Sequence, residues 1–138
     1  MRTVVDASVA LKWYFPELGS DQAKRVLAEA IDGERELLAP DLILIEFANV
    51  LWKKVQREEC DRGEAEEILD AFGTDAPRLV ASVPLVPRAL ELALRLGEVV
   101  YDCVYLAAAI EGEASLVTAD ARLARCARSV LADVERVG

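Results

Sequence analysis

Four acidic residues stand where their carboxylates could act together. Asp6 and Asp120 each follow a short strand-like run, Asp102 opens an apolar helical stretch, and Glu46 lies inside the apolar run 42–50. Carboxylates brought to one place repel one another, by up to about 4 kcal/mol per close pair at an effective dielectric of 20, and need a cation or shared protons. A site built only of oxygen ligands favours Mg²⁺ or Mn²⁺.

Each acid also has a purely structural interpretation. Taken singly, the three aspartates are better explained as helix N-caps, which stabilise a helix by about 1 kcal/mol without any function. Glu46 differs, because burying an unpaired carboxylate costs several kcal/mol. It shares a narrow polar stripe with Asn49, Lys53 and Arg57. A salt bridge to Lys53 or Arg57 and ligation of a metal therefore explain Glu46 equally well.

Composition narrows the possible chemistry. The chain has no histidine, which removes Ser-His and Cys-His nucleophile pairs and the usual nitrogen ligands of zinc. Its three cysteines are widely spaced without a CxxC pair, so neither a disulfide framework nor a zinc site is expected. The net charge of −9 argues against diffuse binding to nucleic acid and leaves that task to a local basic rim or a bound metal.

Length and hydropathy place the chain among globular proteins. Its 138 residues suit one domain, which we expect to span residues 1–138. No apolar run approaches the ~20 residues of a membrane span, and the first residues do not resemble a signal peptide. We therefore expect a cytoplasmic protein without membrane contact.

Helices and short strands alternate from end to end, which predicts a parallel sheet covered on both faces. We expect strands at 3–5, 36–39, 114–118 and 130–137, with a strand or extended link at 78–83. We expect helices at 7–14, 20–31, 41–57, 64–72, 88–96, 102–110 and from 120 onward, with Gly73 to Pro77 breaking the fourth. Ligands of such sheets bind at the carboxyl ends of the strands, where the four acids could converge.

Four segments carry a resemblance to a known family. They are VVDASVALKWYFPE at 4–17, LAPDLILIEFANVLWK at 38–53, YDCVYLAAA at 101–109 and LVTADARLA at 116–124. In order and approximate spacing they resemble the PIN-domain family, and closely the VapC-type toxin ribonucleases of bacterial and archaeal toxin–antitoxin pairs. Four acids in matching contexts make this resemblance specific, and it spans nearly the whole chain.

The resemblance implies both a fold and a function. The fold is a three-layer α/β/α sandwich with a mainly parallel five-stranded sheet, usually found as a homodimer. The function is metal-dependent cleavage of RNA, with a VapB-type antitoxin as partner. Asp6, Glu46, Asp102 and Asp120 match the acids that hold one or two Mg²⁺ or Mn²⁺ ions, and the supporting positions are Ser8, Asn49 and Thr118.

Contact with RNA would have to come from local cations in so acidic a chain. The candidates are Lys12, Lys53, Arg57, Arg122 and Arg125. One alternative function is a PIN-like module whose main task is to hold an antitoxin or other subunit, which the high apolar content and the aromatic residues near Trp13 and Trp52 would suit. A phosphotransfer enzyme is a weaker alternative, because no second acid stands beside Asp6 and no lysine follows Thr118.

Overall fold

The computed structural model describes residues 1–138 and contains one five-stranded sheet. The strands are β1 (Arg2–Val5), β2 (Glu36–Pro40), β3 (Arg78–Val80), β4 (Ser115–Thr118) and β5 (Val134–Arg136). Their order is β3-β2-β1-β4-β5, and every neighbouring pair is parallel. The predicted α/β class and parallel five-stranded sheet are confirmed. All strands therefore end at the same edge of the sheet.

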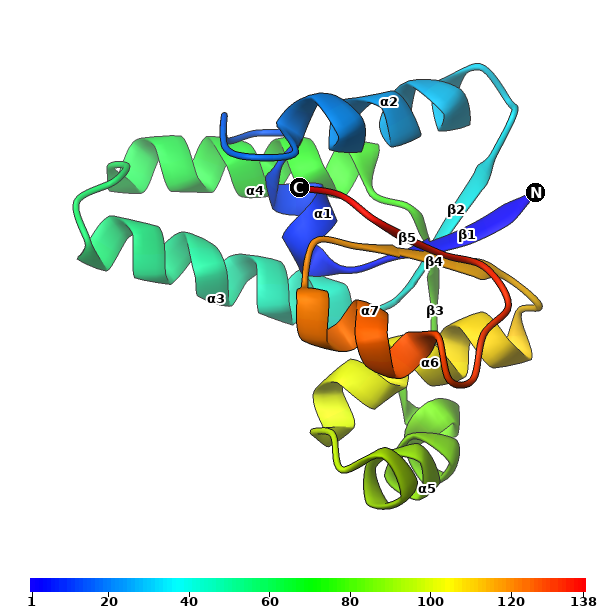
Figure 1. Ribbon diagram of the computed structural model, residues 1–138. Helices are drawn as coiled ribbons and strands as arrows, with labels where there is room; N and C mark the ends of the chain where they lie inside the picture. The colour runs from blue at the N-terminus through cyan, green and yellow to red at the C-terminus, as the bar shows by residue number, and fades with distance from the viewer.

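Helices cover both faces and complete three layers (Figure 1). The crossovers from β1 to β3 run over one face and contain α1 (Ala7–Leu11), α2 (Ser20–Ile31), α3 (Leu42–Gln56) and α4 (Arg62–Asp75). The other face carries the 3₁₀ turn η1 (Val83–Leu85), α5 (Val86–Leu96), α6 (Val100–Glu111) and α7 (Ala121–Ala127). Right-handed crossovers place their helices on one face while the chain moves across the sheet from β1 to β3. They place them on the other face when the chain moves back toward β4 and β5. None of the helices combines the length and apolar character needed to cross a membrane.

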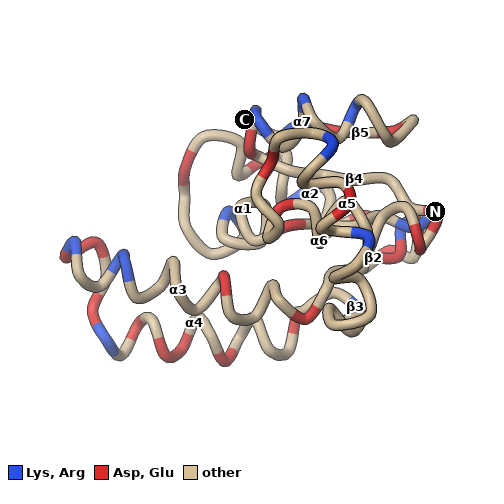
Figure 2. The backbone as a smooth tube through the Cα atoms, turned by 90° about the horizontal axis from the view of Figure 1, so that it is seen from below, with Lys and Arg blue, Asp and Glu red and all other residues tan.

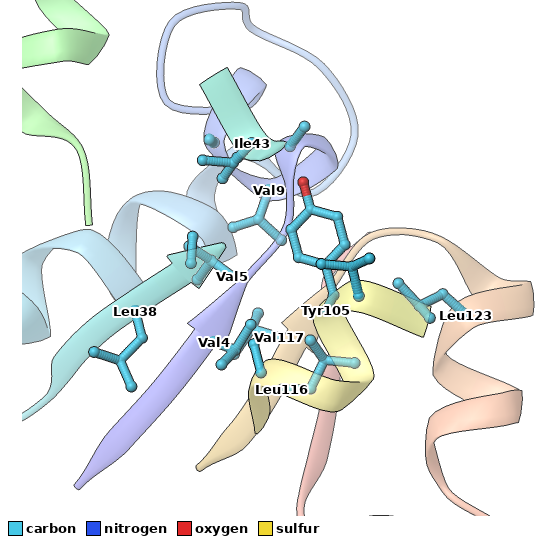
Figure 3. Close-up of a cluster of buried hydrophobic side chains, with 14 of the residues drawn as sticks. Val4, Val5, Val9, Leu38, Ile43, Tyr105, Leu116, Val117 and Leu123 are labelled. Atoms are coloured by element: carbon cyan, nitrogen blue, oxygen red, sulfur yellow. The ribbon is translucent and has the colours of Figure 1, made fainter. Parts of the chain in front are cut away.

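The core lies on both faces of the sheet, and on one face it fills the space between the central strands and α6. Val4, Val5, Leu116 and Val117 of β1 and β4 are wholly buried (Figure 3). Every residue of α6 from Cys103 to Ala109 is also buried. This helix is apolar on all sides because it lies between the sheet and α5, with which it makes the most extensive helix–helix contact in the molecule. The packing fixes the start of α6, and with it the position of Asp102.

An aromatic cluster holds α3 and α4 together on the opposite face. Phe47 of α3 stacks on Phe72 of α4 with ring centroids 4.1 Å apart. Tyr14 meets both rings edge-on, and the buried Trp13 donates its indole N–H to the carbonyl of Ala23. The two helices project from the body as an antiparallel arm (Figure 2). The cluster near Trp13 is thus part of the core, and it anchors the helix that carries Glu46.

Several element ends differ from those predicted. The helix α6 begins at Val100, two residues before Asp102. The helix α1 ends at Leu11, and β5 covers only Val134–Arg136. The helix α4 begins after Asp61, which forms a capping box with Glu64, and it runs through Gly73. Such capping and the packing of the neighbouring aromatic ring outweigh the roughly 1 kcal/mol that a glycine costs inside a helix.

Candidate functional site

The four acids meet at the carboxyl edge of the sheet. A cavity of about 510 Å³ is lined by Asp6 after β1, Glu46 of α3, Asp102 of α6 and Asp120 after β4. Its other polar lining residues are Ser8, Asn49, Lys53, Tyr101 and Tyr105, and its apolar ones are Ala7, Leu11, Leu42, Ile45 and Val50. The predicted convergence of the acids is therefore observed in the structure.

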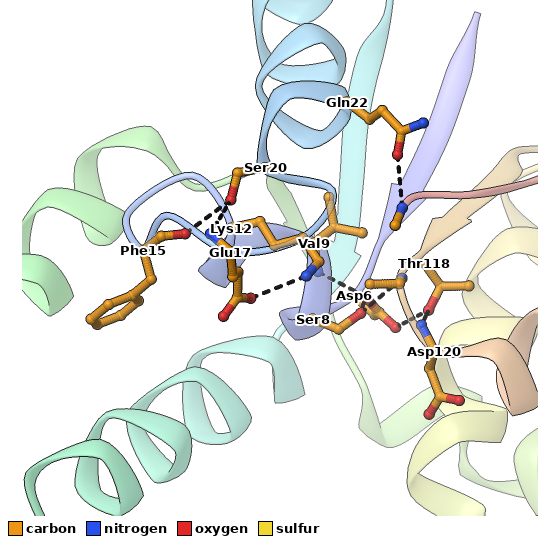
Figure 4. A network of polar contacts seen from close by, with 12 residues as sticks. Asp6, Ser8, Val9, Lys12, Phe15, Glu17, Ser20, Gln22, Thr118 and Asp120 are labelled. Carbon is orange, nitrogen blue, oxygen red and sulfur yellow. Dashed lines mark hydrogen bonds and ion pairs between the residues drawn. The ribbon is translucent and has the colours of Figure 1, made fainter. Parts of the chain in front are cut away.

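Asp6 is held by hydrogen bonds to both carboxylate oxygens (Figure 4). Its Oδ1 accepts from Ser8 Oγ at 2.6 Å and from the Val9 amide at 3.2 Å, and its Oδ2 accepts from Thr118 Oγ1 at 2.5 Å. The two hydroxyls in turn accept backbone N–H groups: Ser8 from Ala119 and Thr118 from Asp120, each at 3.0 Å. The network ties the end of β1 to the end of β4.

Burial and hydrogen bonding act on Asp6 in opposite directions. The residue is only 6% exposed. Burial is the largest influence and raises the pKa of its carboxyl, hydrogen bonds from Ser8, Thr118 and Val9 lower it, and the charge of Asp120 adds a further rise. The pKa therefore remains above its ordinary value despite three donors. Asp6 also caps α1 by accepting the Val9 backbone N–H. The structure is therefore compatible both with a capping role and with a role as an acid of the site.

Asp120 likewise combines two roles. Its Oδ1 accepts from the backbone N–H groups of Arg122 at 2.8 Å and Leu123 at 3.2 Å, which caps α7. The cap uses one carboxylate oxygen, and Oδ2 makes no hydrogen bond. The exposed side chain therefore keeps one oxygen available at the cavity.

Glu46 forms none of the salt bridges proposed for it. Neither Lys53 nor Arg57 pairs with its carboxylate, although both lie on the same helix. Glu46 Oε1 is buried without any hydrogen-bond partner, and so is the hydroxyl of Tyr105. Burial is the largest influence on Glu46 and raises the pKa of its carboxyl. The nearby Tyr105 hydroxyl lowers this pKa, and the charge of Asp6 raises it further. An orphaned carboxylate oxygen at a cavity is a group that a cation would satisfy.

Asp102 does not cap its helix, which corrects that interpretation. It lies in the first turn of α6, behind the extended residue Val99. Burial first, and then the charges of Glu98, Asp120, Glu46 and Asp6, raise the pKa of its carboxyl to about 6. The direction of this shift agrees with the mutual repulsion predicted for the cluster.

The side chains around the cavity offer the type of ligand that a hard divalent cation prefers. The donors are carboxylates, and the cavity walls contain neither histidine nor cysteine. No group of three acidic, thiol or imidazole side chains is arranged closely enough to hold a single ion in this conformation. The acids share the cavity without closing around one point.

Comparison with known proteins assigns the chain to a family. A family model described as PIN domain matches residues 3–129. The chain belongs to the PIN-domain family. It is 36% identical over 126 residues to Ribonuclease VapC3 of Pyrobaculum aerophilum, an alignment that covers 90% of this chain and 93% of that relative.

Two solved structures share the PIN-domain fold. PAE2754 from Pyrobaculum aerophilum superposes with a TM-score of 0.69 at 23% identity, over 91% of this chain and 87% of the other. A chain of VapBC2 from Rickettsia felis, crystallised with a DNA fragment from their promoter, gives a TM-score of 0.71 at 17% identity over 100% of both chains. At these identities the likeness concerns the fold alone.

The predicted cationic contacts are dispersed around this PIN domain. Lys53 lines the cavity. Lys12 lies outside it and pairs with Glu17 at 3.1 Å, and Arg122 pairs with Glu98 at 2.8 Å. Arg57 and Arg125 are exposed and form no ion pair. Ser8 and Thr118 donate hydrogen bonds to Asp6 as expected, whereas Asn49 lines the cavity without a hydrogen bond to an acid.

Sequence reasoning missed three residues of the site. Tyr101 and Tyr105 line the cavity from α6, and Glu98 is the carboxylate with the largest electrostatic effect on Asp102. The signal for Glu98 was available, because it is a lone acid between a helix-ending glycine and the apolar start of the next helix. Tyr101 directly precedes Asp102, and Tyr105 follows it by about one helical turn.

Proposed function

We propose that this PIN domain, spanning residues 1–138, is a metal-dependent endoribonuclease and the toxin of a toxin–antitoxin pair. The observation that carries the proposal is the meeting of Asp6, Glu46, Asp102 and Asp120 in one cavity, with a buried oxygen of Glu46 left unpartnered. The 36% identity to Ribonuclease VapC3 over nearly the full length of both chains supports RNA as the substrate and a VapB-type antitoxin as the partner.

The four carboxylates would hold Mg²⁺ or Mn²⁺. Such an ion, when bound, makes water a nucleophile near neutral pH and neutralises charge that develops on the phosphate oxygens. Ser8 and Thr118 fix the orientation of Asp6 and keep its pKa from rising further. Asp120 presents its free oxygen from a rigid cap, and Lys53 at the cavity wall is placed to attract a phosphate of the RNA backbone.

Cleavage of RNA by the purified chain, freed of any antitoxin, tests the proposal. We expect cutting with Mg²⁺ or Mn²⁺, none with a chelator, and loss in Asp6→Asn and Asp102→Asn. The products should carry 5′-phosphates and 3′-hydroxyls, since the proposed nucleophile is water and not the ribose 2′-hydroxyl. Asp70→Asn, on the exposed side of α4, is the matched control and should cut normally. Cutting that persists in the chelator, or in both site variants, would contradict the proposal.

A PIN-like module whose main role is to hold an antitoxin or another protein partner is the second candidate, and the exposed apolar residues of α5 favour contact with a protein. This helix buries Ala89, Leu92 and Ala93 but leaves Leu90 49% and Leu94 78% exposed on its outer side. We propose that a second copy of the chain covers this apolar side, giving a homodimer. An Mn²⁺ affinity that is unchanged by Asp6→Asn would favour binding as the main role over catalysis.

A further inference from the structure

Glu98 is a buried carboxylate outside the four-acid set. Its side chain is 2% exposed. Its Oε1 accepts from the Val99 amide at 3.0 Å, and its Oε2 accepts from Cys126 Sγ at 3.5 Å and pairs with Arg122 Nε at 2.8 Å. The carboxylate is thus fully engaged, and its one compensating positive charge comes from α7.

The ion pair joins the two segments that carry Asp102 and Asp120. Glu98 lies four residues before Asp102, just ahead of α6, and Arg122 lies two residues after Asp120, in the first turn of α7. The backbone N–H of Arg122 also donates to Asp120 Oδ1 at 2.8 Å. The backbone of Arg122 is therefore tied to one acid of the site, while its guanidinium is directed to Glu98.

The guanidinium of Arg122 is a potential competitor for the site. Its side chain is 66% exposed and has a long, rotatable stem. The backbone N–H of Arg122 donates to Asp120 Oδ1 at 2.8 Å, so the stem of this side chain starts beside an acid of the site. A guanidinium held at Glu98 is therefore close to a cluster of carboxylates whose mutual repulsion any cation would relieve.

We propose that Glu98 is a positioning residue that holds the Arg122 guanidinium outside the four-acid cavity, so that the acids stay available to a metal ion. The proposal rests on the function proposed above, because it assumes that these acids hold the ion. In this proposal Arg122 pairs with Glu98 to keep the arrangement of the four acids intact, and it does not contact RNA. Without Glu98, the guanidinium loses its only ion-pair partner, and Asp120, whose carboxylate accepts the backbone N–H of the same residue, offers an alternative one.

Calorimetric titration of Mn²⁺ into the metal-free protein tests this role without relying on activity. We expect Glu98→Gln to weaken Mn²⁺ binding about tenfold, within the usual range for residues that orient metal ligands. Adding Arg122→Gln to that variant removes the competing cation and should restore the affinity to near the wild-type value. A role in stability alone predicts no such restoration. Thermal unfolding establishes that both variants are folded.

Glu66→Gln is the matched control, because Glu66 pairs with Arg62 at 2.8 Å on an exposed part of α4 remote from the site. It should bind Mn²⁺ like the wild type. Unchanged affinity in Glu98→Gln would overturn the role of Glu98, and so would a double variant that stays as weak as the single one. If the wild type binds no Mn²⁺, or Asp6→Asn binds it equally well, the proposed function itself fails.

Discussion

Asp6 and Glu46 meet the cost of burying a carboxylate in different ways. Asp6 receives three hydrogen bonds, two of them from the hydroxyls of Ser8 and Thr118. Glu46 leaves one oxygen without a partner. In both, burial is the largest influence and raises the pKa above its ordinary value. One acid is thus oriented in advance, and the other remains free to take a new partner.

Replacing Thr118 by Val tests this orientation, because it removes the hydroxyl that donates to Asp6 Oδ2 and accepts from the Asp120 backbone N–H. The change removes the O–H donor to Asp6 Oδ2 with little change of shape, so the pKa of Asp6 should rise further. We expect the acidic limb of the pH–rate profile for RNA cleavage to move to higher pH by about one to two units, since a hydrogen bond to a charged group is worth roughly 1.5–3 kcal/mol.

Thr3→Val is the control, because Thr3 is an equally buried strand threonine whose hydroxyl contacts Ser115 rather than an acid. Its profile should match that of the wild type. A profile of Thr118→Val that also matches would show that the hydroxyl does not tune Asp6.

At the scale of elements, the arm formed by α3 and α4 sets the position of Glu46. The contact between the arm's helices includes the stacked rings of Phe47 and Phe72, both wholly buried. Phe47 follows Glu46 directly in α3, so the ring that anchors the helix and the carboxylate that lines the cavity leave adjacent backbone positions. Packing of α4 is thereby coupled to the geometry of the site.

Phe72→Ala should therefore affect both stability and the site. We expect a loss of about 3–5 kcal/mol in the free energy of unfolding, as for other buried phenylalanines, together with weaker Mn²⁺ binding as α3 loosens. Urea unfolding and Mn²⁺ titration measure the two effects. Phe72→Leu should cost less because it retains more volume, and Leu69→Ala, at a 39% exposed position of α4, should cost little. Equal losses in Phe72→Ala and Leu69→Ala would refute the coupling.

At the scale of the whole molecule, the buried carboxylates of the site reduce the stability of the folded protein as pH rises. Asp6, Glu46 and Asp102 all have a raised pKa in the folded protein. Each therefore binds its proton more tightly when folded than when unfolded. The stability that this binding contributes is fully present below the unfolded pKa and is lost as pH rises through the folded pKa. For Asp102 the interval extends from 3.8 to about 6.

We expect the metal-free protein to lose part of its stability between about pH 4 and pH 6, and Mn²⁺ to restore it near neutral pH because binding favours the folded state. Thermal unfolding across this range, in chelator and in Mn²⁺, measures both effects. Asp102→Asn should show a shallower loss than the wild type, since it lacks one of the titrating groups. An identical pH dependence in the two proteins would rule out this contribution of Asp102.

The sequence by itself contained the order of the elements and the location of the acids along them. Strand-forming runs before Asp6 and Asp120 and the caps that both provide are local signals, which depend on neighbouring residues only. The convergence of the acids followed from parallel topology, since all strands of such a sheet end at one edge. The match of four segments to the PIN-domain family pointed to the same residues.

Only the tertiary structure decided which partners each side chain has. Packing of α6 between the sheet and α5 starts that helix at Val100, which leaves Asp102 free of a capping role. The position of α3 on the sheet places Glu46 at the cavity, where it forms no ion pair with the cations of its own helix. The pairing of Glu98 with Arg122 joins residues 24 positions apart. Such contacts depend on how elements pack in three dimensions, and local sequence pattern does not encode them.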